Sequence, residues 1–132
     1  MTSVNNRKKV LVVDGSDIVL DRMRGLLHEV DSISEIFTAR GFEEALAVMA
    51  THQPEIVLLE IALPGKSGFD LLAFIKAHHP NTRTMILTNL SGEVYRQRSY
   101  ELGADYFIDK SGEFELINRI IGNDASVAYP SH

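Results

Sequence analysis

The fold is decided by the stretch Ile56-Val57-Leu58-Leu59-Glu60-Ile61-Ala62-Leu63-Pro64-Gly65. Its first residues form an apolar run that is too short for a helix and lacks the alternation of a half-buried strand. Such a run is typical of a strand covered on both faces of a sheet. Pro64-Gly65 predicts a turn shortly afterwards. The stretch therefore places one carboxylate, that of Glu60, at the end of a buried strand.

Four more segments of the chain have the composition of short strands, at residues 8–14, 35–39, 84–88 and 105–110. Helices are predicted at residues 16–30, 41–51, 91–102 and 112–121, and between Gly65 and Pro80. Strands that alternate with helices are joined by right-handed crossovers and lie parallel. The sequence therefore predicts the α/β class, with a five-stranded parallel sheet flanked on both faces by five helices.

The first predicted helix has one apolar face, which should pack on the sheet. Val19, Met23, Leu26, Leu27 and Val30 make up this face. The charged residues of the helix lie away from it.

Polar or ionisable residues end four of the five predicted strands: Asp14, Glu60, Thr88 and Lys110. The carboxyl ends of parallel strands meet at one edge of the sheet, where open α/β folds bind their ligands. We therefore expect these four side chains to form one site.

Composition limits the classes of function. The chain has 132 residues, 45% of them apolar, a net charge of -5 and no cysteine. This suits one domain at residues 8–121, with disordered segments at 1–7 and 122–132. The acidic balance argues against direct DNA binding, and no apolar stretch is long enough to span a membrane. We expect a cytoplasmic protein without disulfides.

Several motifs along residues 8–121 resemble the receiver domains of bacterial response regulators, which have a (βα)5 flavodoxin-like fold. The motifs are Val10-Leu11-Val12-Val13-Asp14, Leu63-Pro64-Gly65-Lys66-Ser67-Gly68-Phe69, Leu87-Thr88 and Gly103-Ala104-Asp105-Tyr106-Phe107-Ile108-Asp109-Lys110. The resemblance implies a module of two-component or phosphorelay signalling. Its partners would be a histidine kinase, a phosphotransfer protein or an output protein.

The resemblance also implies roles for the strand-end residues. In the family, two adjacent acids after the first strand hold Mg²⁺, and an aspartate after the third strand accepts the phosphoryl group. Lys110 matches the lysine that neutralises phosphate oxygens, and Thr88 matches the hydroxyl that bonds the phosphoryl group. Phe107 matches the aromatic residue that moves inward with that hydroxyl.

The chain departs from this pattern at both acidic positions. Gly15 replaces the acid that directly binds the metal, and Glu60 replaces the acceptor aspartate. One extra methylene moves a carboxylate by about an ångström, and misplacement on this scale can slow a reaction by about a hundredfold. We therefore expect no catalytic residue, no enzymatic activity and little or no phosphoacceptance.

The charge of the pocket leads to a similar expectation for the metal. Asp14, Glu60 and Lys110 sum to -1, so no dication is required. Weak Mg²⁺ binding by Asp14, Glu60 and the Ala62 carbonyl stays open, because Mg²⁺ often uses only one or two protein carboxylates. Asp17 is a less favoured substitute ligand. Asn89 and Ser111 also differ from the usual family residues and predict altered access to the site and an altered loop.

Two roles for Glu60 are compatible with the sequence. It can pair with Lys110 simply to join the strand ends. It can also contact both Lys110 and Thr88 and partly imitate a phosphoryl group, whose charge of about -2 exceeds that of one glutamate. A receiver that still takes phosphate at Glu60 with Mg²⁺ is the alternative function. A nucleotide-binding domain is disfavoured, because Asp14-Gly15-Ser16 is not a glycine-rich phosphate loop.

Two surfaces are candidates for protein contacts. Ile18 lies off the apolar face of the first helix and near the strand-end edge. The fourth helix, fifth strand and fifth helix carry opposite charges that suit a homodimer face, although a solvated mixed surface is the favoured explanation. The residues of this second surface are Tyr95, Arg96, Arg98, Tyr100, Asp105, Asp109, Glu113, Glu115 and Arg119.

Overall fold

The computed structural model describes residues 7–90, 92–111 and 114–122. Strands and helices alternate along the whole of this part of the chain, as the sequence predicts. The elements are β1 Lys8–Val13, α1 Asp17–His28, β2 Ile33–Ala39, α2 Phe42–His52, β3 Ile56–Leu59, α3 Gly68–His78, β4 Arg83–Thr88, α4 Glu93–Glu101, β5 Tyr106–Asp109 and α5 Phe114–Gly122. Their bounds lie within two residues of the expected ones.

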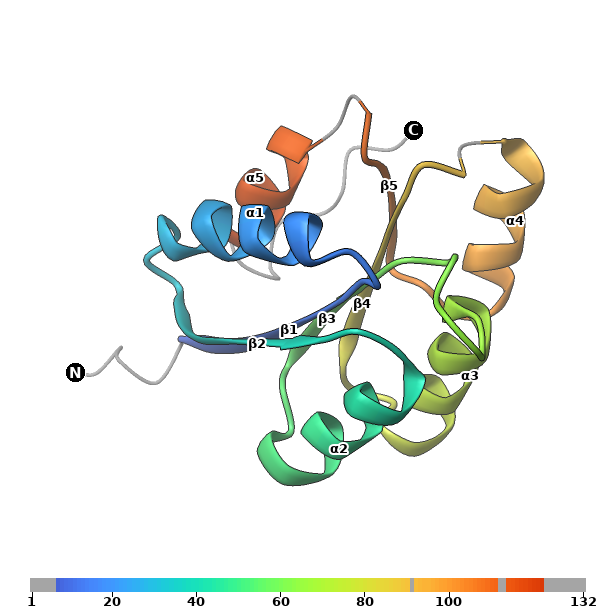
Figure 1. Ribbon diagram of the computed structural model, residues 1–132, viewed down its shortest axis with the longest axis horizontal. Coiled ribbons are helices and arrows are strands. Elements are labelled where there is room, and N and C mark those ends of the chain that lie inside the picture. Colours follow the sequence, from blue (N-terminus) through green and yellow to red (C-terminus); the bar gives the residue numbers. More distant parts are fainter. Residues whose placement is uncertain (1–6, 91, 112–113, 123–132) are drawn as a thin grey trace.

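All five strands are parallel and form one sheet in the order β2-β1-β3-β4-β5. The expected five-stranded α/β fold is therefore confirmed. Helices α1 and α5 cover one face of the sheet and α2 and α3 the other, while α4 stands beside β4 and β5 (Figure 1). Strand β3 is central, so the residue that follows it lies in the middle of the sheet edge.

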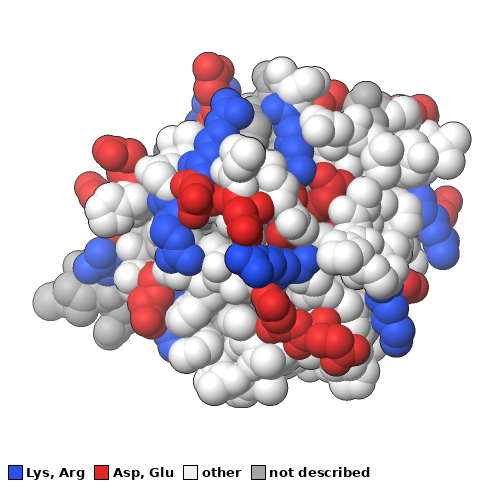
Figure 2. Space-filling view, viewed as in Figure 1, with Lys and Arg blue, Asp and Glu red and all other residues white. Residues whose placement is uncertain are grey.

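The surface carries charges of both signs. On the face shown in Figure 2, acidic and basic side chains alternate and neither sign forms one continuous field. Within the described residues, no helix is both long and apolar enough to cross a lipid bilayer.

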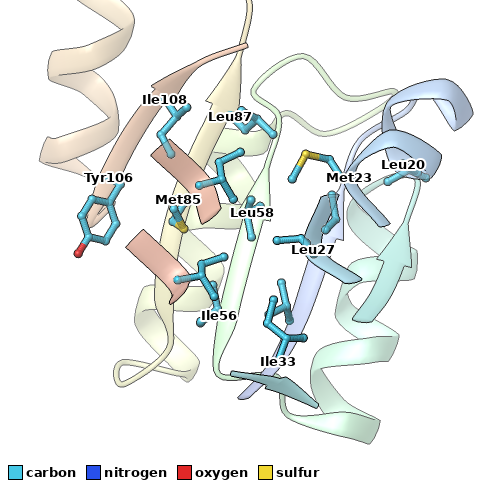
Figure 3. Close-up of a cluster of buried hydrophobic side chains, with 14 residues drawn as sticks. Leu20, Met23, Leu27, Ile33, Ile56, Leu58, Met85, Leu87, Tyr106 and Ile108 are labelled. Atoms are coloured by element: carbon cyan, nitrogen blue, oxygen red, sulfur yellow. The ribbon is translucent and has the colours of Figure 1, made fainter. Parts of the chain in front are cut away.

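Two hydrophobic cores lie on opposite faces of the sheet, because successive strand residues point to opposite sides. One core contains Val10, Leu58 and Met85 together with residues of α1 and α5 (Figure 3). The other contains Leu11, Leu59 and residues of α2 and α3. Strand β3 is buried along its whole length, which explains its uninterrupted apolar sequence.

Two details of the elements differ from the sequence expectation. Strand β2 begins at Ile33 rather than at residue 35, because its start pairs with Lys8. Ser34 is exposed on this edge strand, so its polar side chain gives no sign of a strand in the sequence. On α1, Leu20 is buried together with the expected Met23 and Leu27.

The loop after β3 is held against the backbone of Gly68. The Gly68 N–H donates to the Ile61 carbonyl over 2.8 Å, and Ser67 forms a reciprocal cap with Asp70. A Cβ atom on Gly68 would lie only 2.0 Å from the Glu60 carbonyl oxygen. Glycine is needed there because two backbone segments meet without room for a side chain.

We predict that Gly68→Ala lowers the free energy of unfolding by about 3 kcal/mol, because the clash is with backbone that cannot turn aside. Gly25→Ala is the matched control, since a Cβ on Gly25 meets nothing within 4 Å. This helix substitution should stabilise the chain by about 0.5–1 kcal/mol. Urea denaturation measures both. A Gly68→Ala protein as stable as the wild type would contradict this account of the loop.

Candidate functional site

The sheet brings the four predicted side chains together at its carboxyl edge. Asp14, Glu60 and Lys110 directly follow β1, β3 and β5, and Thr88 is the last residue of β4. Backbone hydrogen bonds continue past the strand ends: the Glu60 N–H donates to the Val13 carbonyl over 3.0 Å, and the Lys110 N–H to the Thr88 carbonyl over 2.9 Å. Regular sheet pairing therefore fixes where these side chains start.

The Lys110 ammonium lies between two carboxylates. Its Nζ atom is 2.6 Å from Asp14 Oδ2 and 2.6 Å from Glu60 Oε1. The three side chains retain only 10%, 7% and 8% of their exposure for Lys110, Asp14 and Glu60. Ion pairs this buried are weakly screened by water and salt.

Burial disfavours the charged form of Lys110, but the two carboxylates outweigh it. Desolvation lowers the pKa of Lys110, whereas hydrogen bonds and charge attraction from Asp14 and Glu60 raise it, and the net effect is a pKa above its ordinary value of 10.5. Lys110 is therefore positively charged at neutral pH.

The second oxygen of Glu60 is also occupied. The Thr88 hydroxyl donates to Glu60 Oε2 over 2.5 Å, and the Ala62 N–H donates to the same atom over 3.0 Å. Thr88 Oγ1 in turn accepts a hydrogen bond of 3.1 Å from the Leu90 N–H. The hydroxyl is thus fixed between the β4–α4 loop and the glutamate.

Asp14 completes the arrangement. Its Oδ1 atom accepts a hydrogen bond of 2.8 Å from the Ser16 N–H, while Oδ2 accepts from Lys110. All four carboxylate oxygens of Asp14 and Glu60 therefore accept hydrogen bonds from protein donors. Both acids bond the backbone N–H two residues further along the chain, a pattern common for aspartate at turns.

The oxygens available for a metal are those of Asp14 and Glu60 and the Ala62 carbonyl. Mg²⁺ prefers octahedral oxygen coordination at about 2.0–2.1 Å, and each of these carboxylate oxygens already accepts a hydrogen bond from the protein. Gly15 adds no ligand, and Asp17 forms a paired contact with Arg40 at 2.8 and 3.0 Å. Among the described residues, no three histidine, cysteine or acidic side chains are grouped for metal binding. The present donor arrangement does not fit a dedicated Mg²⁺ site.

The remaining predicted residues lie around this cluster. Phe107 is fully buried in the second core, whereas Asn89 is exposed beyond Thr88. Ser111 donates from both its N–H and its hydroxyl to Asp109 Oδ1, at 2.8 and 2.7 Å, which shapes the turn after Lys110. Ile18 is 81% exposed.

Two contacts were not anticipated from the sequence. The Ala62 N–H, and not only the carbonyl expected from the sequence to be a metal ligand, is involved, because it donates a hydrogen bond to Glu60. Arg96 lies over the ring of Phe107, with its guanidinium carbon 4.8 Å from the ring centroid. The two-residue spacing from Glu60 to Ala62 was a usable signal for the first contact, but nothing in the sequence links Arg96 to Phe107.

Comparison with known proteins agrees with the fold. The fimbriae Z protein of Salmonella typhimurium is 31% identical over 76% of this chain and 48% of its own length. A protein-glutamate methylesterase/protein-glutamine glutaminase of Oleidesulfovibrio alaskensis is 33% identical over 77% of this chain and 28% of its own length. The chain thus spans about half or less of the length of these curated relatives.

A solved structure of the BeF₃-activated receiver domain of DrrB, from Thermotoga maritima, superimposes with a TM-score of 0.77. It is 26% identical and covers 86% of this chain and 92% of that domain. The sequence profile of the response regulator receiver domain matches residues 10–121. The chain therefore belongs to the response regulator receiver domain family of two-component signalling.

Proposed function

We propose that this receiver domain signals through protein binding and does not depend on phosphorylation. One observation carries the proposal: the Glu60 carboxylate is bound at the same time by Lys110, Thr88 and the Ala62 N–H. Both of its oxygens are therefore already committed inside the protein. It acts as a fixed internal anion rather than as an acceptor that awaits a phosphoryl donor.

The chemistry of phosphoryl transfer supports this proposal. That reaction depends on placing the nucleophile in line with the donor and on neutralising charge with a metal. Here the nucleophile is a longer acid whose oxygens accept hydrogen bonds, and Gly15 supplies no metal ligand. Asp14, Glu60 and Lys110 sum to a charge of -1. We therefore propose that Mg²⁺ is not required, and that any Mg²⁺ that binds is held weakly by Asp14, Glu60 and the Ala62 carbonyl.

The contacts of Glu60 favour partial imitation of a phosphoryl group over a purely structural ion pair. A structural pair needs only Lys110, yet Glu60 also binds Thr88, the residue matched to the family's switch hydroxyl. Phe107, matched to the aromatic that moves inward with that hydroxyl, is fully buried. In this proposal Glu60 holds the domain in one arrangement without a phosphate, although with a single charge rather than about two.

The proposed partners are other signalling proteins in the cytoplasm, either a histidine kinase, a phosphotransfer protein or an output protein. The net charge of -5 disfavours direct DNA binding. The exposed Ile18, near the strand-end edge, is a candidate contact. A homodimer through α4, β5 and α5 has weaker support, because Arg98 pairs with Glu101 of its own helix and Glu113 lies outside the described residues.

We predict that the chain gains no stable phosphate when it is incubated with Mg²⁺ and a small phosphodonor and its intact mass is measured. The positive control is the double variant Gly15→Asp/Glu60→Asp, which restores both family acids. At residue 15 a Cβ atom would lie 3.1 Å from Pro64 Cδ, so only a small shift of that ring is needed. A gain of one phosphate by the unmodified chain would refute the proposal.

We predict that Lys110→Met lowers the free energy of unfolding by about 3 kcal/mol at neutral pH, because it leaves two buried carboxylates without their shared cation. Arg40→Met is the matched control, since the Arg40–Asp17 pair is more than half exposed. It should cost no more than about 1 kcal/mol. Chemical denaturation gives both values. Equal losses for the two variants would show that the buried cluster contributes no more than a surface pair.

The raised pKa of Lys110 predicts how this difference depends on pH. A group whose pKa is higher in the folded chain stabilises it fully below the unfolded value of 10.5, and that contribution is lost as the pH rises through the folded value. The stability difference between wild type and Lys110→Met should therefore stay constant from neutral pH to about 10 and shrink above 10.5. Denaturation across this range measures it. A stability difference that already shrinks below about pH 9, where an ordinary lysine is still charged, would contradict the raised pKa of Lys110.

A further inference from the structure

Helix α4 has little apolar attachment to the rest of the domain. Only Ser99 of its nine residues is buried, while Val94 and Tyr95 are 75% and 37% exposed. Leu90 and Leu102, which flank the helix, pack partly against the second core. Between these two leucines, no apolar side chain among the described residues of α4 is buried.

Arg96 makes a contact between α4 and β5. It is half-buried, and its guanidinium carbon lies 4.8 Å from the centroid of the Phe107 ring. A guanidinium within about 6 Å of a ring centroid is attracted to the face of the ring. Phe107 is fully buried, so the cation covers a side chain that water does not reach.

Asp109 lies on the same side of β5 as Phe107. Phe107 and Asp109 are two residues apart on the strand and thus point to the same face of the sheet. Hydrogen bonds from the Ser111 hydroxyl and N–H lower the pKa of Asp109, and the charge of Arg96 lowers it further. Asp109 therefore stays anionic and adds attraction to the ring contact.

We propose that Arg96 is a latch that holds α4 against β5 and keeps Phe107 turned inward. The proposal goes beyond the role of Glu60, because the latch acts whether or not residue 60 accepts phosphate. It assigns the position of α4 to one charged side chain instead of to apolar packing. A partner that draws Arg96 away from the ring would release α4 and Phe107 together.

The test is hydrogen exchange of the backbone amides of α4, recorded by NMR in the full chain together with the ring resonances of Phe107. Arg96→Gln keeps most of the side-chain length but removes the charge and the planar cation. It should speed exchange in α4 by about tenfold and shift the Phe107 ring signals. Arg98→Gln is the matched control on the same helix. Arg98 is 55% exposed, and among the described ion pairs its guanidinium contacts only Glu101 of the same helix. This control should leave both readouts at the wild-type level.

Arg96→Lys separates charge from packing. It keeps the positive charge and loses the planar group, so its exchange rate should lie between those of wild type and Arg96→Gln. Equal α4 exchange in Arg96→Gln and Arg98→Gln, or unchanged Phe107 ring signals in Arg96→Gln, would overturn the proposal. Exchange in Arg96→Lys as fast as in Arg96→Gln would overturn the role of the charge. Glu60→Gln should leave the Arg96 effect in place, which distinguishes the latch from the function proposed for Glu60.

Discussion

The arrangement of the sheet edge depends on one buried ammonium shared by two carboxylates. Lys110 follows β5, Glu60 follows β3 and Asp14 follows β1, so one cation joins three strands that are far apart in sequence. Removing charges from water is costly, and the ion pairs offset that cost only when the remaining oxygens also find donors. Ser16, Ala62 and Thr88 supply those donors. Replacing a cluster of this kind by apolar side chains is often neutral or stabilising, whereas removing one of its partners is costly.

The same constraint connects the fold to its proposed signalling role. Strand β3 is central, so Glu60 lies between Asp14, which follows β1, and Thr88, which ends β4. The hydroxyl of Thr88 is anchored to the start of the β4–α4 loop through Leu90, and Phe107 is buried beneath the helix that follows this loop. Two contiguous hydrogen bonds thereby connect Glu60 to the loop that leads into α4. In the proposed account, this fixed chain of contacts takes the place of a reversible phosphate.

Much of this architecture follows from local sequence, and the remainder depends on contacts between distant residues. The buried runs at β1 and β3 and the glycine and proline turns predict the alternating fold, because strands covered on both faces have uninterrupted apolar sequences. Parallel strands then place Asp14, Glu60, Thr88 and Lys110 at one edge. The sequence does not predict the early start of β2, because an exposed edge strand tolerates polar residues such as Ser34. The contact of Arg96 with the Phe107 ring depends on how the strands pack together. The same is true of the donors that bind each carboxylate oxygen.

The central claim is that Glu60 is an internal anion already satisfied by the protein. Its most direct test is a crystal structure of the chain grown with Mg²⁺ and beryllofluoride, the phosphoryl analogue bound in the activated DrrB domain. The account predicts that Glu60 keeps its contacts with Lys110, Thr88 and the Ala62 N–H, with no beryllofluoride attached to it. A beryllofluoride group on Glu60, with a metal ion beside Asp14 and Lys110 turned toward the fluorines, would contradict it.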